Sequence, residues 1–168
     1  MKQIDIAELR QQLDYNPETG EITRKIRTTK TEVGDVAGYL NKSTGYLMLK
    51  VKGQTFKAHR VCWAIYYGYW STMEIGHINH NKIDNRISNL REATHLENHR
   101  NKSLFKNSTS GIPGVVWNKI NRKWDVCIYI KRIKVHLGSY KDFEEAKEVR
   151  LAAEVRYGYH KNHGKVIA

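Results

Sequence analysis

A polar stretch without periodicity divides this chain of 168 residues into two parts that we expect to fold separately. The stretch NKSLFKNSTSG, from Asn101 to Gly111, is rich in Asn, Ser and Lys and lacks a sustained apolar repeat, which is typical of a linker. Hydrophobic residues make up 40% of the chain, enough for real cores on both sides. We therefore expect domains at 1–100 and 111–160, a linker at 101–110 and a basic tail at 161–168.

The first part has the pattern of a small α+β domain. The segment DIAELRQQLDY places apolar residues at helical spacing behind Asp5, a capping residue, and NPETGE carries turn signals. Between positions 21 and 57, short apolar runs separated by glycines predict antiparallel strands and hairpins. The segment AHRVCWAIYYG then predicts a largely apolar helix that ends at Gly68.

The second part predicts a three-stranded antiparallel sheet packed on one helix. GVVWN, KWDVCIYI and KVHLG have strand patterns, and DFEEAKEVRLAAEVRYG predicts an amphipathic helix that begins with a capping box at Asp142. Such a sheet has one face on the helix and one face free. Alternation assigns to the helix face Val115, Trp117, Trp124, Val126, Ile128, Val135 and Leu137, and to the free face Asn118, Asp125, Tyr129, Lys134 and His136.

Charge indicates a polyanionic partner. The formal net charge is +12, and the 41 residues from Asn101 to Lys141 hold nine Lys or Arg against one acid. This basic run lies in a part with strand patterns, and membrane binding typically uses a basic amphipathic helix, so nucleic acid is favoured as the partner over a membrane surface. A solvated basic face without a partner is the plainer alternative.

Targeting and cysteine signals are weak. No apolar run is long enough to span a membrane, and the N-terminus lacks a signal-peptide core. Cys62 and Cys127 stand apart in apolar segments, which favours buried free thiols over a disulfide. We expect a cytoplasmic protein.

The stretch from Ile75 to Asn101 gathers four of the eight histidines and six asparagines. Mg²⁺ prefers oxygen ligands, so a metal site there needs a carboxylate as well. A zinc site from His77, His80, His95 and His99 is a weaker alternative. A polar surface hairpin with Asn-rich turns is the plainer one.

This stretch resembles the HNH endonuclease family, particularly the phage-type homing endonucleases. The matching residues are His77, the loop INHNKIDNRIS, the run Asn89-Leu90-Arg91, and Asn98 nine positions beyond Asn89. YNPETGEITRK and GYLNKSTGYLMLKVKGQTFKAHRVCWAIYYG extend the resemblance over roughly the first hundred residues.

The resemblance implies a ββα-metal fold, with two strands and a helix around a single divalent cation, Mg²⁺ or Mn²⁺. It implies that His77 is the general base, that Asn89 orients the surroundings of His77, and that Asn98 binds the metal. Arg86 and Arg91 are candidates for phosphate contacts, with a structural ion pair as the alternative. The other three histidines of the stretch are expected on a solvated or DNA-facing surface.

One position departs from the family pattern. The family usually has an acidic metal ligand immediately before the general base, and this chain has Gly76 there. We favour an inactivating substitution, because the rest of the motif is intact. Natural loss of cutting with retained DNA binding, and replacement of the ligand by Glu74 or Asp84, remain open.

The second part resembles the plant Apetala2-type DNA-binding domain in the version appended to phage HNH nucleases. SGIPGVVW, RKWDVCIYI, KVHLGSYKDFEEA and RLAAEVRYG carry this resemblance, which implies a sheet that enters the major groove of double-stranded DNA. Val116 and Tyr129 stand where the plant domains have arginine, so base specificity does not transfer.

The free face and the turns supply the expected DNA contacts. Lys134 is expected to read guanine and Asn118 adenine, while the turn cations contact phosphates. The full set is Asn118, Lys119, Arg122, Lys123, Tyr129, Lys131, Arg132, Lys134 and His136.

Together these patterns predict an HNH homing endonuclease that cuts or nicks double-stranded DNA, encoded by a phage and acting in the bacterial cytoplasm without membrane association. The alternative is a non-catalytic DNA-binding regulator on the same fold, and Gly76 favours it. With one nuclease centre per chain a monomer nicks one strand, and the sequence leaves the oligomeric state open.

Overall fold

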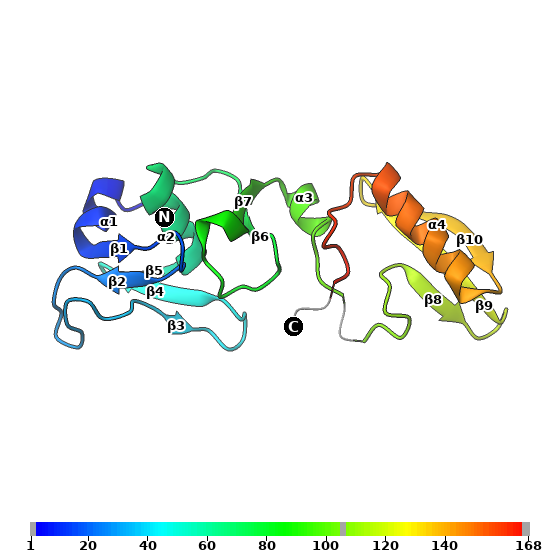
Figure 1. The fold of residues 1–168 in the computed structure, drawn as a ribbon, viewed down its shortest axis with the longest axis horizontal. Coiled ribbons are helices and arrows are strands. Elements are labelled where there is room, and N and C mark those ends of the chain that lie inside the picture. The colour runs from blue at the N-terminus through cyan, green and yellow to red at the C-terminus, as the bar shows by residue number, and fades with distance from the viewer. Residues whose placement is uncertain (1–2, 105–106, 166–168) are drawn as a thin grey trace. The chain divides into compact units, whose positions relative to one another are not determined.

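The computed structural model describes residues 3–104 and 107–165. The chain forms two compact units, Met1–Thr94 and His95–Ala168, both built from helices and small antiparallel sheets (Figure 1). The predicted α+β class is confirmed. The division falls after Thr94, so the segment that carries Asn98 belongs to the second compact unit. In these two ranges no helix is long and apolar enough to cross a membrane.

The first unit begins with a short capped helix and a hairpin. Helix α1 spans Ile6–Gln12, and the Asp5 side chain accepts a hydrogen bond from the Ala7 N–H at 2.7 Å, as a capping residue should. The helix stops at Gln12, because Leu13 is extended and begins strand β1 (Leu13–Tyr15), which pairs with β2 (Ile22–Arg24).

A three-stranded sheet and an apolar helix form the body of this unit. The sheet has the order β3 (Tyr39–Leu40), β4 (Leu47–Val51), β5 (Gln54–Lys57). Helix α2 (Ala58–Tyr67) follows and ends at Gly68, whose φ of 80° is left-handed as predicted for a C-cap glycine. The largest fully buried side chains here are Leu9, Leu13, Leu49, Val51 and Val61.

Two strands and a long connection complete the first unit. Strand β6 (Glu74–His77) pairs antiparallel with β7 (Leu90–Ala93), and the turn η1 (Ile87–Asn89) leads into β7. His77 lies at the end of β6, where the connecting loop 78–89 begins.

The second unit has the predicted sheet and helix. Strands β8 (Val115–Asn118), β9 (Lys123–Ile130) and β10 (Ile133–Tyr140) pair in the order β10-β9-β8, and α4 (Phe143–Arg156) packs on one face (Figure 1). The Asp142 side chain accepts from the Glu145 N–H at 2.9 Å, which confirms the predicted cap. The unit also includes the short helix α3 (His95–His99).

Two residues of the sheet are more exposed than predicted. Trp117 stays 39% exposed because β8 is an edge strand with a neighbour on one side only, and its ring rests on Trp124 with 5.1 Å between centroids. Cys127, expected to be buried, is half-buried because it pairs with His136 on the free face, whereas Cys62 is buried as predicted.

The expected linker and tail are hydrogen-bonded to each other. Gly164 N–H donates to the Lys102 carbonyl at 2.8 Å, and just outside these two segments His160 N–H donates to the Arg100 carbonyl at 3.0 Å. Residues 105–106 and 166–168 of these segments lie outside the described residues. This pairing has no periodic signal in the sequence, because each segment is short and polar.

Candidate active site and DNA-binding face

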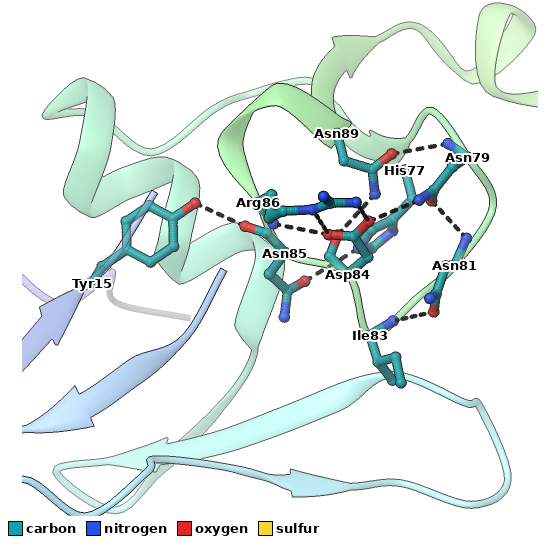
Figure 2. Close-up of polar contacts among 9 residues, drawn as sticks. All are labelled: Tyr15, His77, Asn79, Asn81, Ile83, Asp84, Asn85, Arg86 and Asn89. Atoms are coloured by element: carbon teal, nitrogen blue, oxygen red, sulfur yellow. Dashed lines mark hydrogen bonds and ion pairs between the residues drawn. The ribbon is translucent and has the colours of Figure 1, made fainter. Parts of the chain in front are cut away.

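Asparagine and aspartate side chains organise the loop between β6 and β7. Asn89, only 6% exposed, accepts a hydrogen bond from the Asn79 N–H at 2.9 Å and donates from Nδ2 to the Asp84 carbonyl at 2.8 Å. The Ile78 N–H donates to the Asn89 carbonyl at 2.9 Å. Figure 2 shows Asn89 facing both arms of the loop. Asn89 therefore ties the beginning of the loop to its end.

Asp84 is held by neighbours on the same loop. Its carboxylate accepts from Arg86 Nε at 2.8 Å, from Arg86 Nη2 at 2.6 Å and from Asn79 Nδ2 at 2.8 Å (Figure 2). The hydrogen bonds from Arg86 hold the pKa of Asp84 below its ordinary value. For Arg86 the sequence left a phosphate contact or a structural ion pair, and the structure shows an ion pair with Asp84. A phosphate contact of Arg86 stays a prediction.

His77 is buried and has a carboxamide partner. It is 7% exposed, and its Nε2 lies 3.2 Å from Oδ1 of Asn85, which is 2% exposed. Asn85 is fixed in turn by Tyr15, whose hydroxyl donates to the Asn85 carbonyl at 2.7 Å (Figure 2). A carboxamide oxygen only accepts, so with this assignment of the Asn85 amide Nε2 carries the proton, and Nδ1 is the basic nitrogen of the neutral ring.

Aromatic rings from two other elements pack on His77. The His59 ring from α2 meets it edge-on at 4.9 Å between centroids, and the Tyr46 ring lies 6.0 Å away. Burial lowers the pKa of His77, and it lowers the pKa of His59, which is 4% exposed, to about 2. Both imidazoles are therefore neutral at pH 7, the state that a general base requires.

Gly76 stands in β6 opposite Arg91 of β7. Its backbone is part of a regular antiparallel pair, so a larger residue can adopt the same extended conformation. A side chain at position 76 would share the sheet face of Arg91, because directly paired residues point the same way. Arg91 itself is half-buried, and its phosphate contact stays a prediction.

The described residues do not fit a divalent cation. Position 76 offers no side chain, and Asp84, one candidate replacement, is committed to Arg86 and Asn79. Within the described ranges, no three His, Cys, Asp or Glu side chains are grouped to hold a metal ion. Asn98 lies on α3 in the second compact unit, and its role as a ligand stays a prediction.

One histidine lies elsewhere than predicted, and several neighbours of His77 were not predicted from the sequence. His80, expected on the surface, is buried and has a left-handed φ of 67° in the turn after β6. Asn85, His59 and Tyr46 were not candidates. The AHR segment at the start of the apolar helix was a possible signal for His59, since a polar residue in the first turn of a buried helix needs an explanation.

The free face of the second sheet carries a polar network. Asp125 accepts from Ser139 Oγ at 2.5 Å and from Asn118 Nδ2 at 2.8 Å, and the hydrogen bond from Ser139 is the main reason why the pKa of Asp125 is lowered. Asn118 Oδ1 also accepts from two N–H groups of its own turn, at 3.1 Å and 3.2 Å. Both ends of the Asn118 amide are therefore occupied, so reading adenine requires these bonds to be exchanged.

The expected phosphate-binding cations surround this face. Lys119 and Arg122 lie in the β8–β9 turn, and Lys131 and Arg132 form the two-residue β9–β10 turn, all four exposed. Lys134, His136 and Tyr129 are exposed on the strands, and Lys123 is half-buried. Register places Tyr129 beside Lys134 and His136 beside Cys127. The predicted free face is therefore the face that carries these side chains.

Comparison with known proteins bears on the first of these sites. Residues 56–100 match the model of a family described as HNH endonuclease. A solved structure titled "DNA binding and cleavage by the HNH homing endonuclease I-HmuI" is 24% identical, with a TM-score of 0.45, and the likeness covers 98% of this chain and 96% of that chain. No curated protein matches the chain.

The candidate site lies inside the matching segment. His59, Gly76, His77, Asn85 and Asn89 all fall within residues 56–100. The predicted resemblance to HNH endonucleases is thus confirmed for this segment. The resemblance of the second unit to Apetala2-type domains stays a prediction.

Proposed function

We propose that this chain is an HNH endonuclease of the homing type, built to hydrolyse phosphodiester bonds of double-stranded DNA with one divalent cation, Mg²⁺ or Mn²⁺, and disabled at Gly76. One observation carries the proposal: the His77 imidazole is buried, neutral and hydrogen-bonded to Asn85, and it lies in the segment that matches the HNH family. The second unit supplies the DNA-binding surface through its basic turns and free sheet face.

In this proposal His77 accepts a proton at Nδ1 from the water that attacks the scissile phosphate. Asn85 holds Nε2 and thereby sets the tautomer and the ring orientation, as partners of catalytic histidines do. Asn89 contributes indirectly, because it holds the loop that carries Asn85. Burial keeps the ring unprotonated near neutral pH.

Gly76 separates this proposal from its alternative. Without a carboxylate at that position, the donor set is too poor for a hard cation, which takes several oxygen ligands. The second candidate, a DNA-binding regulator without cutting activity, is favoured by the same observation together with the basic second unit.

The test compares three forms of the full chain on supercoiled plasmid in Mg²⁺ or Mn²⁺: the chain as it stands, Gly76→Asp, and Gly76→Asp combined with His77→Ala. We expect open circles or linear DNA only with Gly76→Asp, since the added carboxylate completes a metal ligand set beside an intact base. Arg91 on the neighbouring strand favours the ionised carboxylate.

Each other outcome has a definite meaning. Cutting by the unchanged chain would show that another group supplies the ligand and that position 76 is unimportant. Binding without cutting by all three forms would favour the regulator. Cutting by the form that lacks His77 would contradict the assignment of the base.

A further inference from the structure

Two lysines from different elements gather over one aromatic ring in the first unit. The Lys57 ammonium lies 4.5 Å from the centroid of the Tyr46 ring, and the Lys82 ammonium lies 4.8 Å from it. Lys57 immediately precedes α2, whereas Lys82 belongs to loop 78–89. Two like charges brought to the same ring repel one another, so this arrangement is suited to an anion.

This pair of lysines lies beside the candidate base. The Tyr46 ring is 6.0 Å from the His77 ring and 5.2 Å from the His59 ring, so the two lysines and the two buried imidazoles are neighbours of the same ring. Both positive charges also act to lower the pKa of His77. An anion held by the lysines therefore lies close to any phosphate that is bound at the His77 imidazole.

Among the described residues neither lysine forms a salt bridge, although the Glu74 carboxylate acts on the ring between them: burial first and Glu74 second raise the pKa of Tyr46. Lys82 donates to the Thr44 carbonyl at 2.9 Å, which fixes its position and leaves two of its three ammonium donors for a ligand. Both side chains are exposed. The first turn of α2 holds no acid and its N-cap makes no side-chain hydrogen bond, so the positive end of the helix adds to the local potential.

We infer that Lys57 and Lys82, held over Tyr46, bind a backbone phosphate of the DNA strand adjacent to the phosphate at His77. The inference rests on the proposed function and adds two contacts that position the strand. Lysine ammonium groups are point charges that suit phosphate oxygens. The Tyr46 ring restrains both side chains, which lowers the entropy that binding must overcome.

The test is the salt dependence of DNA binding by the full chain, measured on one duplex by fluorescence anisotropy. Each lysine that neutralises a phosphate contributes about 0.9 to the slope of log K against log salt. We expect Lys57→Gln and Lys82→Gln each to lower the slope by about that amount, and the double variant to lower it by about twice as much. Replacing both lysines by arginine keeps the charge and should keep the slope.

Lys30→Gln is the matched control. Lys30 is an exposed lysine in the β2–β3 connection, which Figure 1 shows at the end of the first unit away from the β6–β7 hairpin. Its replacement removes one charge from the same unit and should leave the slope unchanged.

The outcomes separate this inference from the proposed function. An unchanged slope in the double glutamine variant, or an equal fall with Lys30→Gln, overturns the inference even if Gly76→Asp cuts plasmid. A reduced slope with no cutting by Gly76→Asp supports the lysine contact and counts against the nuclease. If the unchanged chain fails to bind duplex DNA, both are overturned.

Discussion

The β9–β10 turn offers a direct test of the DNA-binding face, because its backbone is unfavourable for the residues that it holds. Lys131 and Arg132 have φ values of 49° and 69°, and they link Ile130 to Ile133 as a two-residue turn. Such turns favour Asn-Gly, since two successive left-handed residues are costly for longer side chains. Strain kept in this way points to a function of the side chains themselves.

The perturbation is Lys131→Asn together with Arg132→Gly. Left-handed backbone costs about 1–2 kcal/mol per ordinary residue, so relief at two positions should stabilise the hairpin by roughly 1–3 kcal/mol, allowing for the flexibility that glycine adds to the unfolded chain. The same change removes two cations, which should lower the slope of log K against log salt by about 1.8. The loss of affinity between 50 and 200 mM salt then shrinks by about tenfold.

The assay pairs two measurements on the full chain. Hydrogen exchange of the amides in β9 and β10 reports hairpin stability, and anisotropy at several salt concentrations reports DNA binding. Lys131→Gln with Arg132→Gln is the matched control, because it removes the same charges and keeps the strained backbone. The reasoning fails if the Asn-Gly variant exchanges no more slowly than the glutamine control, or if both variants keep the original slope.

Two further predictions concern the first unit. Asn89→Ala leaves the Asn79 N–H and the Asp84 carbonyl without their partner, at a cost of about 2–3 kcal/mol, so amides of loop 78–89 should lose about 30- to 150-fold in exchange protection. Acid should also destabilise this unit: unfolded His59 binds a proton below pH 6.5 and folded His59 only near pH 2, so stability falls as pH decreases, by about 2 kcal/mol at pH 5. Hydrogen exchange at pH 7 and pH 5, corrected for intrinsic rates, measures this loss.

Both predictions have controls within the chain. Ser88→Ala changes an exposed residue beside Asn89, and protection there should stay near that of the unchanged chain. If Ser88→Ala loses as much exchange protection in the loop as Asn89→Ala, the role of the Asn89 hydrogen bonds in holding the loop is contradicted. His59→Gln removes the titrating group, so its stability should depend less on pH between 7 and 5, and an unchanged pH dependence would refute the burial argument.

Local patterns in the sequence determined most of the secondary structure and located the site. The caps at Asp5 and Asp142, the end of α2 at Gly68 and the alternation along β9 all act between near neighbours, so they follow from short stretches alone. The motif around His77 is also a short local pattern, and it lies in the segment that matches the HNH family.

Only the tertiary structure decided which groups surround His77. Loop 78–89 holds several asparagines with the same chemistry. The irregular path of the loop, and not the spacing of these residues, makes Asn85 the partner of His77 and lets Asn89 link the two ends of the loop. His59 and Tyr46, which pack on His77, belong to other parts of the chain, and so does Lys57, which lies over Tyr46. Contacts between residues far apart in the chain depend on how elements pack, and a periodic pattern specifies only which face of each element is buried.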